Sequence, residues 1–91
     1  MENNHLEIQV SLDHEYGLHA RPAAVLAREA QKYSSDIRLC FDGREVDAKS
    51  ILDILTLAAT HGSFLKIRAK GEDAPEAIQR IKELIAGGFG V

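Results

Sequence analysis

Several features that mark whole classes of proteins are absent or scarce in this sequence. Cysteine occurs once, as Cys40, so an internal disulfide is impossible and a cysteine-based zinc site is not expected. The chain has 2 prolines and no repetitive tract, unlike a disordered segment. No apolar run approaches the roughly 18 to 20 residues of a membrane span, and residues 1–10 lack the regions of a signal peptide. We therefore expect a folded, cytoplasmic protein without membrane insertion.

A strong excess of positive charge is also missing. The chain carries 11 Lys and Arg against 14 Asp and Glu, a formal net charge of −3, and its basic residues are scattered. Because a nucleic-acid or anionic-membrane surface needs a basic stripe, we expect protein or small-molecule partners and no nucleic acid. At 91 residues the chain is long enough for one modest core. A single domain over residues 1–91 is the expectation.

Two periodicities are present in place of these features. Alternating apolar and polar residues are typical of half-buried strands, and apolar residues three or four apart are typical of amphipathic helices. They predict strands at 6–12, at 37–41, through Val46 and Ala48, and at 65–69. They predict helices at 22–32, from Ser50 to a break at 61–63, and from 72–75 to a stop at 87–88. Asp42-Gly43, between two strands, is typical of a hairpin turn.

The order of these elements indicates the fold class. It reads strand, helix, strand, strand, helix, strand, helix, or βαββαβα. Because each strand alternates, the sheet should bury one face, as antiparallel sheets do, with the helices gathered on that face. The sequence therefore predicts an α/β (α+β) two-layer open-faced sandwich, with a four-stranded antiparallel sheet and three helices.

The start of the first helix lacks an ordinary cap. Ser, Thr, Asp or Asn usually satisfies the first backbone N–H groups of a helix, but the residues here are His19, Ala20 and Arg21. Pro22 fits the first turn, where no N–H is needed. Unpaired N–H groups and the helix dipole together favour an anion. Gly17 lets the loop bend close, and Arg21 can add donors to the same anion.

The residue type before this helix suggests the chemistry. The imidazole of His19 is a nucleophile near neutral pH, and a phosphoryl group on it would lie over the helix start. A solvent-facing loop histidine is the ordinary alternative. A metal site using His14, His19 and His61 lacks the spacing of known metal motifs, and no metal or cofactor is expected. The loop contains no serine or cysteine that would support hydrolytic catalysis.

Two separated motifs resemble one known family. Residues 17–24, GLHARPAA, resemble the active-site signature of the HPr/NPr family, the histidine-containing phosphocarriers of the bacterial phosphoenolpyruvate-dependent phosphotransferase system. Ala48-Lys49-Ser50-Ile51-Leu52, followed by Leu55 and Leu57, resembles the second motif of that family. The resemblance extends over residues 5–86 and includes the order of elements.

The resemblance implies a relay in which His19 is the phosphohistidine. His19 would accept a phosphoryl group on Nδ1 from Enzyme I and pass it to IIA proteins or domains during sugar uptake. Arg21 and the backbone N–H groups of Ala20 and Arg21 would bind that phosphoryl group. The protein would then be a covalent phosphocarrier, not a turnover enzyme on its own, and is expected to be a monomer.

Ser50 has two compatible interpretations. Physically it is a good N-cap, with Asp53 three residues later in the arrangement of a capping box. By resemblance it matches the serine that HPr kinase/phosphorylase modifies to regulate partner choice. The carboxylate of Asp53 would oppose a phosphate at Ser50, so regulation by this route stays open.

The helix after Ser50 carries more apolar side chains than one inward stripe needs. In the family this surface binds Enzyme I, IIA proteins and regulators. We therefore predict a docking surface of Leu18, Ile51, Leu52 and Leu55, which could also serve transcriptional regulators. The alternative is a wider core under the last helix.

Other functions of the same fold remain open at this stage. One is a regulatory adaptor that binds partners through the second helix without transferring phosphate. Another is the nitrogen-related branch of the system, whose carriers often have a Gly-Phe pair near the end, as Gly88-Phe89 is here. Tyr16 departs from the small polar residue of many relatives, which affects the expected loop hydrogen bonding but not the histidine.

Overall fold

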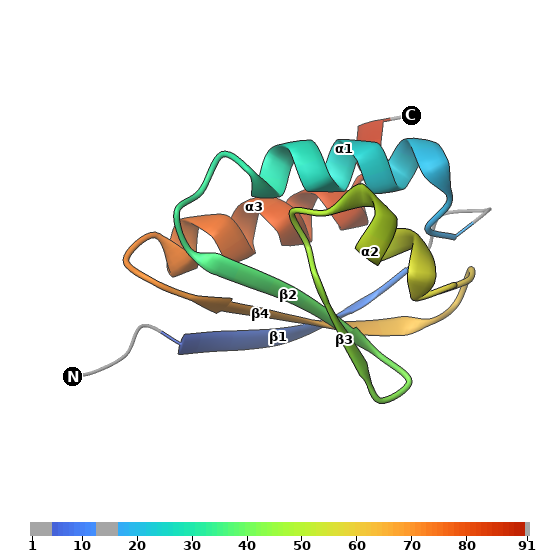
Figure 1. Ribbon diagram of the computed structural model, residues 1–91, viewed down its shortest axis with the longest axis horizontal. Coiled ribbons are helices and arrows are strands. Elements are labelled where there is room, and N and C mark those ends of the chain that lie inside the picture. The colour runs from blue at the N-terminus through green and yellow to red at the C-terminus, as the bar shows by residue number, and fades with distance from the viewer. Residues whose placement is uncertain (1–4, 13–16, 91) are drawn as a thin grey trace.

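The computed structural model describes residues 5–12 and 17–90, and Figure 1 shows the arrangement of their helices and strands. In chain order the elements are β1 (His5–Ser11), α1 (Ala20–Ala30), β2 (Asp36–Phe41), β3 (Arg44–Asp47), α2 (Ile51–Thr56), β4 (Phe64–Lys70), α3 (Ala74–Ala86) and the short 3-10 turn η1 (Gly88–Gly90). Tyr16 and His14, both weighed above, lie outside the described residues.

One antiparallel sheet carries the three helices. Its strands lie in the order β1-β4-β2-β3, and every neighbouring pair is antiparallel. Ile67 in the central strand β4 lies opposite Ile8 of β1 and Leu39 of β2. The helices all lie on one side of the sheet and leave the other side open (Figure 1). The predicted fold class is therefore confirmed.

The core lies between the sheet and the helices. Ile37, Leu39 and Ile67 from the sheet are fully buried, as are Leu26 of α1 and Ile81 of α3. Burial of each such side chain contributes about 1.5 to 3 kcal/mol of hydrophobic free energy. The alternation read from the sequence separates this apolar layer from the polar open face, as predicted.

Helix α1 begins earlier than the sequence pattern predicted. The expected range was 22–32, whereas the helix runs from Ala20 to Ala30. Apolar spacing locates the buried stripe of a helix, but the first residues of a helix need not belong to that stripe. Pro22 is consequently the third helical residue, still within the first turn, where its missing N–H removes no helical hydrogen bond.

The hairpin turn is as expected. Asp42 and Gly43 have φ angles of 53° and 79° between β2 and β3. Positive φ at both central positions is the requirement of the tight turn that matches the twist of a two-stranded ribbon. The turn places Arg44 at the first position of β3.

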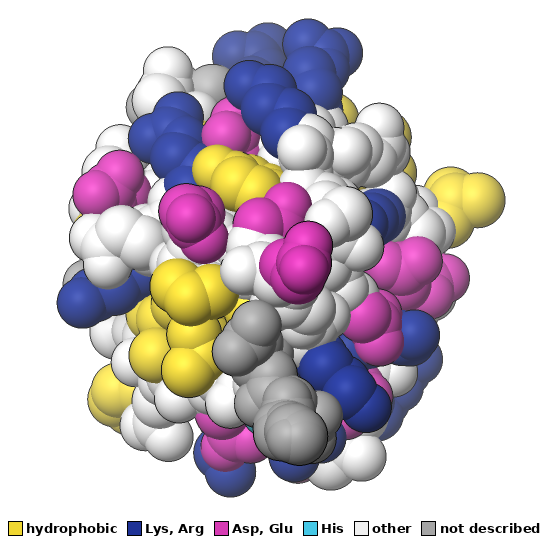
Figure 2. All heavy atoms as spheres, turned by 90° about the vertical axis from the view of Figure 1, so that its left-hand side faces the viewer, with side chains coloured by type: hydrophobic (Ala, Val, Ile, Leu, Met, Phe, Trp, Pro, Cys, Tyr) yellow, Lys and Arg dark blue, Asp and Glu magenta, His cyan; other side chains and the backbone are white. Residues whose placement is uncertain are grey.

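A carboxylate joins two loops at the end of the molecule away from the start of α1. Asp73 accepts hydrogen bonds of 2.9 Å from the backbone N–H groups of both Ser34 and Ser35, and a further one from the Ser35 hydroxyl. The Ser35 hydroxyl and the backbone N–H of Ser34 are the main causes that lower the pKa of Asp73 to about 2. Figure 2 shows this end, where acidic and basic side chains are intermixed.

The described helices were also considered as membrane spans. None of those within residues 5–12 and 17–90 combines the length and the apolar character needed to cross a bilayer.

Candidate functional site

His19 occupies the N-cap position of α1. Its backbone is extended, with φ −100° and ψ −168°, and its side chain makes no capping hydrogen bond to the described helix. The residue is exposed. None of the described residues in the first turn of α1 is acidic. The first turn of α1 therefore places no acidic side chain of its own where it would compete with an external anion.

The donors at this helix start can be assigned individually. The first bond of the helical ladder is donated by the Ala23 N–H to the His19 carbonyl, at 2.9 Å. Pro22 has no N–H, so Ala20 and Arg21 supply the first-turn N–H groups that have no acceptor within the helix. Both residues are exposed. Together with the helix dipole, these donors favour an anion next to His19.

The loop before His19 rests on the segment that follows α2. Gly17 has a φ of 74°, and a Cβ there would lie 2.5 Å from the Ala59 carbonyl oxygen and 2.8 Å from Thr60 Cα. The next N–H, that of Leu18, donates a 3.0 Å hydrogen bond to the same carbonyl of Ala59. Only glycine fits this contact. The sequence indicated the glycine but gave no signal for Ala59 and Thr60 as its support.

The structure overturns one of the predicted docking residues. Leu18 is 4% exposed and belongs to the hydrophobic core. The resemblance to the family had placed it on the docking surface beside three residues of α2. Instead, the Leu18 N–H bond to Ala59 turns the loop inward at this residue, and its side chain anchors the loop. Its assignment to an exposed docking surface is wrong.

The remaining three docking candidates keep exposed area. Leu52 is 76% exposed and Ile51 is 41% exposed, while Leu55 is half-buried against the core. Among the described residues of α2, Ile54 is the one that is buried. The prediction that some apolar side chains of this helix face outward is confirmed, and Ile54 is the side chain that faces inward. Their role in docking stays a prediction.

Ser50 caps α2, as predicted. Its hydroxyl oxygen accepts a 3.2 Å hydrogen bond from the Asp53 N–H. The Asp53 carboxylate accepts from the Asp47 N–H at 3.4 Å, whereas the Ser50 N–H donates to the Asp47 carbonyl. The reciprocal half of a capping box is thus absent among these residues. Two acidic side chains, Asp47 and Asp53, are linked to the turn that contains Ser50.

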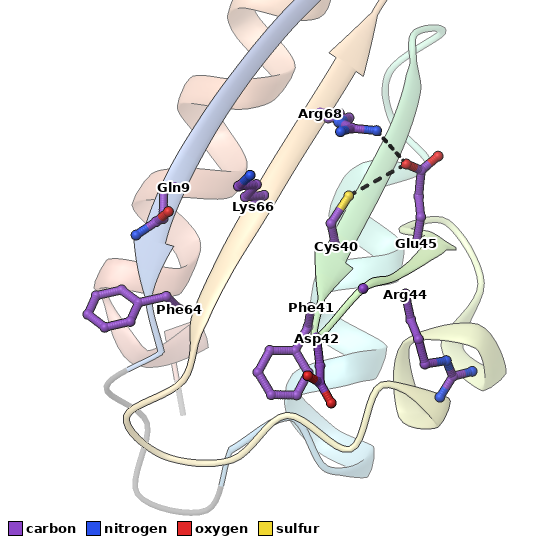
Figure 3. A pocket seen from close by; sticks show the side chains of 10 residues that line it. Gln9, Cys40, Phe41, Asp42, Arg44, Glu45, Phe64, Lys66 and Arg68 are labelled. Carbon is purple, nitrogen blue, oxygen red and sulfur yellow. Dashed lines mark hydrogen bonds and ion pairs between the residues drawn. The ribbon is translucent and has the colours of Figure 1, made fainter.

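A hollow on the open face of the sheet is separate from these residues. It has a volume of about 400 Å³ and is bounded by β1, β4 and the β2–β3 hairpin (Figure 3). None of the predicted site residues lines it. Burial is the main cause that raises the pKa of the Cys40 thiol in its wall, so the thiol stays protonated near neutral pH. Cys40 points to the open face of the sheet (Figure 3).

Metal ligation was tested on the same described residues. Within residues 5–12 and 17–90 no three His, Cys, Asp or Glu side chains are grouped so that they could hold a metal ion. His14, one of the three histidines weighed for such a site, lies outside these ranges.

The chain, with this exposed histidine at the start of α1, is similar to known proteins. The sequence model of one family, described as "PTS HPr component phosphorylation site", matches residues 6–87. The chain belongs to the HPr family. This match confirms the resemblance seen over residues 5–86 to within one residue at each end.

Individual members of the HPr family are similar over most of the chain. The phosphocarrier protein HPr of Xylella fastidiosa is 39% identical over 84 residues, which are 92% of this chain and 94% of the relative. The HPr-like protein Crh of Bacillus subtilis is 43% identical over 65 residues, which are 71% of this chain and 76% of the relative. A crystal structure of HPr from Thermoanaerobacter tengcongensis has a TM-score of 0.91 at 40% identity and covers 94% of this chain and 97% of its own.

Membership of the HPr family fixes the broad role of the chain. HPr proteins are phosphocarriers of the phosphotransferase system. The chain is accordingly a phosphocarrier-family protein and not in itself a turnover enzyme.

Proposed function

We propose that His19 is the residue that carries the phosphoryl group, which it accepts from phosphorylated Enzyme I and passes to IIA proteins or domains for sugar uptake. The observation that supports this most directly is the position of His19, exposed at the uncapped start of α1. A carrier must meet two different partners in turn. An exposed histidine suits transfer between two protein surfaces.

The transfer is an exchange of one N–P bond for another. The lone pair on Nδ1 of neutral His19 attacks phosphorus while the N–P bond of the Enzyme I phosphohistidine breaks, and the electron pair of that bond returns to the donor imidazole. Transfer to a IIA protein repeats the exchange with His19 as donor. Such a step depends on positioning and on stabilising the charge of the three outer oxygens.

The groups around His19 match this requirement. The N–H groups of Ala20 and Arg21 supply donors from the helix start, and the Arg21 guanidinium supplies a permanent positive charge and a planar fork. No cofactor takes part in this scheme. The partners dock on Ile51, Leu52 and Leu55, the exposed apolar part of α2. A cytoplasmic monomer over residues 1–91 completes the proposal.

The test is phosphorylation by purified Enzyme I and phosphoenolpyruvate, followed by mass measurement of the intact chain. The parent protein should gain one acid-labile, base-stable phosphate, and His19→Ala should gain none. His61→Ala, which removes another exposed histidine, is the matched control and should be labelled like the parent. Label retained by His19→Ala would refute the assignment of His19.

A second function, regulation through Ser50, has weaker support. Ser50 lies in the turn before α2, next to the exposed Ile51 and Leu52, so a phosphate there would alter the docking surface. Asp47 and Asp53 would repel that phosphate. ATP-dependent labelling by HPr kinase/phosphorylase, lost in Ser50→Ala, tests this function. The same surface would also serve transcriptional regulators.

The nitrogen-related branch receives no separate support from Gly88-Phe89. Phe89 is 2% exposed and packs into the core after α3. Packing accounts for a phenylalanine at this position, whichever branch the carrier serves. We therefore keep sugar uptake as the proposed branch.

A further inference from the structure

An arginine from the β2–β3 hairpin reaches across to the end of α2. Arg44 donates from Nη1 to the carbonyl oxygen of Thr56 and from Nη2 to the Thr56 hydroxyl oxygen, the latter at 3.2 Å. Thr56 is the last residue of α2. Figure 3 shows the Arg44 side chain, at the rim of the open-face hollow, extending from the hairpin toward this helix.

Helix α2 is short and lacks a basic residue of its own at its C-terminal end, so a contact from another element can stabilise it. It has 6 residues, and isolated helices shorter than about 12 residues are marginal in water. Among these described residues Ile54 alone is buried, and none in the last turn is basic. A cation at the C-terminal end of a helix satisfies its carbonyl groups and complements the dipole. Arg44 supplies that cation from another element.

The contact lies at one end of a continuous path to the histidine loop. Three residues after Thr56, the carbonyl of Ala59 accepts the Leu18 N–H and lies against Gly17. The opposite end of α2 carries the exposed Ile51 and Leu52. A fixed C-terminus of α2 therefore holds the docking surface, while the separate bond from Leu18 to Ala59 holds the loop that ends at His19.

We propose that Arg44 is a positioning residue for phosphoryl transfer, which orders α2 and thereby sets the affinity of the docking surface for Enzyme I. The expected effect on the affinity for Enzyme I rests on the proposed function, whereas the expected ordering of α2 does not. The hydrogen bonds given for Arg44 go to Thr56, at the end of α2, and it takes no direct part in the proposed transfer step. Its loss should weaken partner binding and leave the chemical step nearly unchanged.

The test compares three variants in the Enzyme I assay and in amide hydrogen exchange of the free protein. Arg44→Met keeps the apolar stem and removes the guanidinium, and Arg44→Lys keeps the charge but loses the fork. Arg38→Met is the matched control, because Arg38 is a sheet arginine that pairs with Asp36 and makes no contact with α2 among the described residues. Circular dichroism should confirm that each variant is folded.

In Arg44→Met we expect the KM for the carrier to rise about three- to tenfold, the scale of one or two lost surface hydrogen bonds, with kcat within about twofold. Exchange of the α2 amides should accelerate to a similar degree. Arg44→Lys should recover less than half of both effects, and Arg38→Met should show neither.

Three results would overturn the proposal. The first is unchanged α2 exchange in Arg44→Met. The second is a KM effect equal to that of Arg38→Met, and the third is full recovery by Arg44→Lys, since both would make net charge the cause. If the parent protein is not phosphorylated on His19, the proposed function fails, and hydrogen exchange still tests whether Arg44 orders α2.

Discussion

The N–H of Leu18 donates a 3.0 Å hydrogen bond to the carbonyl of Ala59 and so ties the residue before His19 to the segment after α2. The two residues are far apart in the sequence, and the bond joins the loop before His19 to the segment that follows α2. The support of the proposed phosphorylation site thus lies next in the chain to the helix that carries the proposed docking surface.

Gly17→Ala should damage both stability and transfer. A Cβ at this position would lie 2.5 Å from the Ala59 carbonyl oxygen, at a φ of 74° that disfavours side chains. We expect a loss of about 2 kcal/mol or more in the free energy of unfolding, together with slower phosphorylation of His19. Urea unfolding and the Enzyme I assay measure the two effects. Gly43→Ala, where a Cβ meets nothing within 4 Å, separates φ strain from the clash; equal losses in both variants would contradict the role of Ala59.

Ala58→Gly should stabilise the protein. Ala58 has a φ of 54° just after α2, a conformation that costs a residue with a side chain about 1 to 2 kcal/mol. Glycine removes this strain but gives the unfolded chain more freedom, so we expect a net gain of about 0.5 to 1 kcal/mol. Thermal unfolding provides the measurement, and a lower melting temperature in the variant would count against the strain.

Leu52 and Leu18 should respond oppositely to the same substitution. Leu52→Ser alters a side chain that is 76% exposed, so stability should stay within about 0.5 kcal/mol while affinity for Enzyme I falls about tenfold. Leu18→Ser places a hydroxyl in the core and should cost about 2 to 4 kcal/mol of stability. Calorimetric titration and urea unfolding separate the two. Unchanged binding by Leu52→Ser would remove Leu52 from the docking surface.

Arg21→Ala should slow the transfer step. The Arg21 guanidinium is exposed beside the helix start and is proposed to stabilise the transferring oxygens. Loss of a charge-assisted hydrogen bond predicts a rate about 10- to 100-fold lower, measured by rapid-quench phosphorylation. Arg21→Lys keeps the charge without the fork and should lie between. Arg28→Ala, an exposed arginine further along α1, is the control; an equal effect there would point to general charge instead.

Asp73 should make stability depend on pH in the acid range. Hydrogen bonds lower the pKa of Asp73 from 3.8 to about 2 on folding. Its contribution to the free energy of unfolding is therefore complete above pH 3.8 and is lost as the pH falls through about 2. Asp73→Asn should be less stable at neutral pH and should lose less stability in acid than the parent. Urea unfolding across this range checks the prediction. The control is Asp42→Asn, in the exposed hairpin turn, which should follow the parent curve.

The sequence by itself determined the order of elements, the face of each strand that is buried and the position of His19 before a helix without a cap. These follow from local rules, since the period of apolar residues depends on backbone geometry and the capping of a helix depends on its own first residues. Ser50 as a cap and Asp42-Gly43 as a turn could be predicted for the same reason.

Only the tertiary structure decided that Leu18 is buried and that Ala59 contacts Gly17. The same holds for the hydrogen bonds by which Asp73 joins two loops and for those of Arg44 to the end of α2. Each is a contact between segments distant in the chain, and one sequence contains no periodicity or spacing that specifies the partner. From the sequence alone, the side chain of Leu18 could equally face solvent. The hydrogen bond to Ala59 is what fixes the direction of its loop.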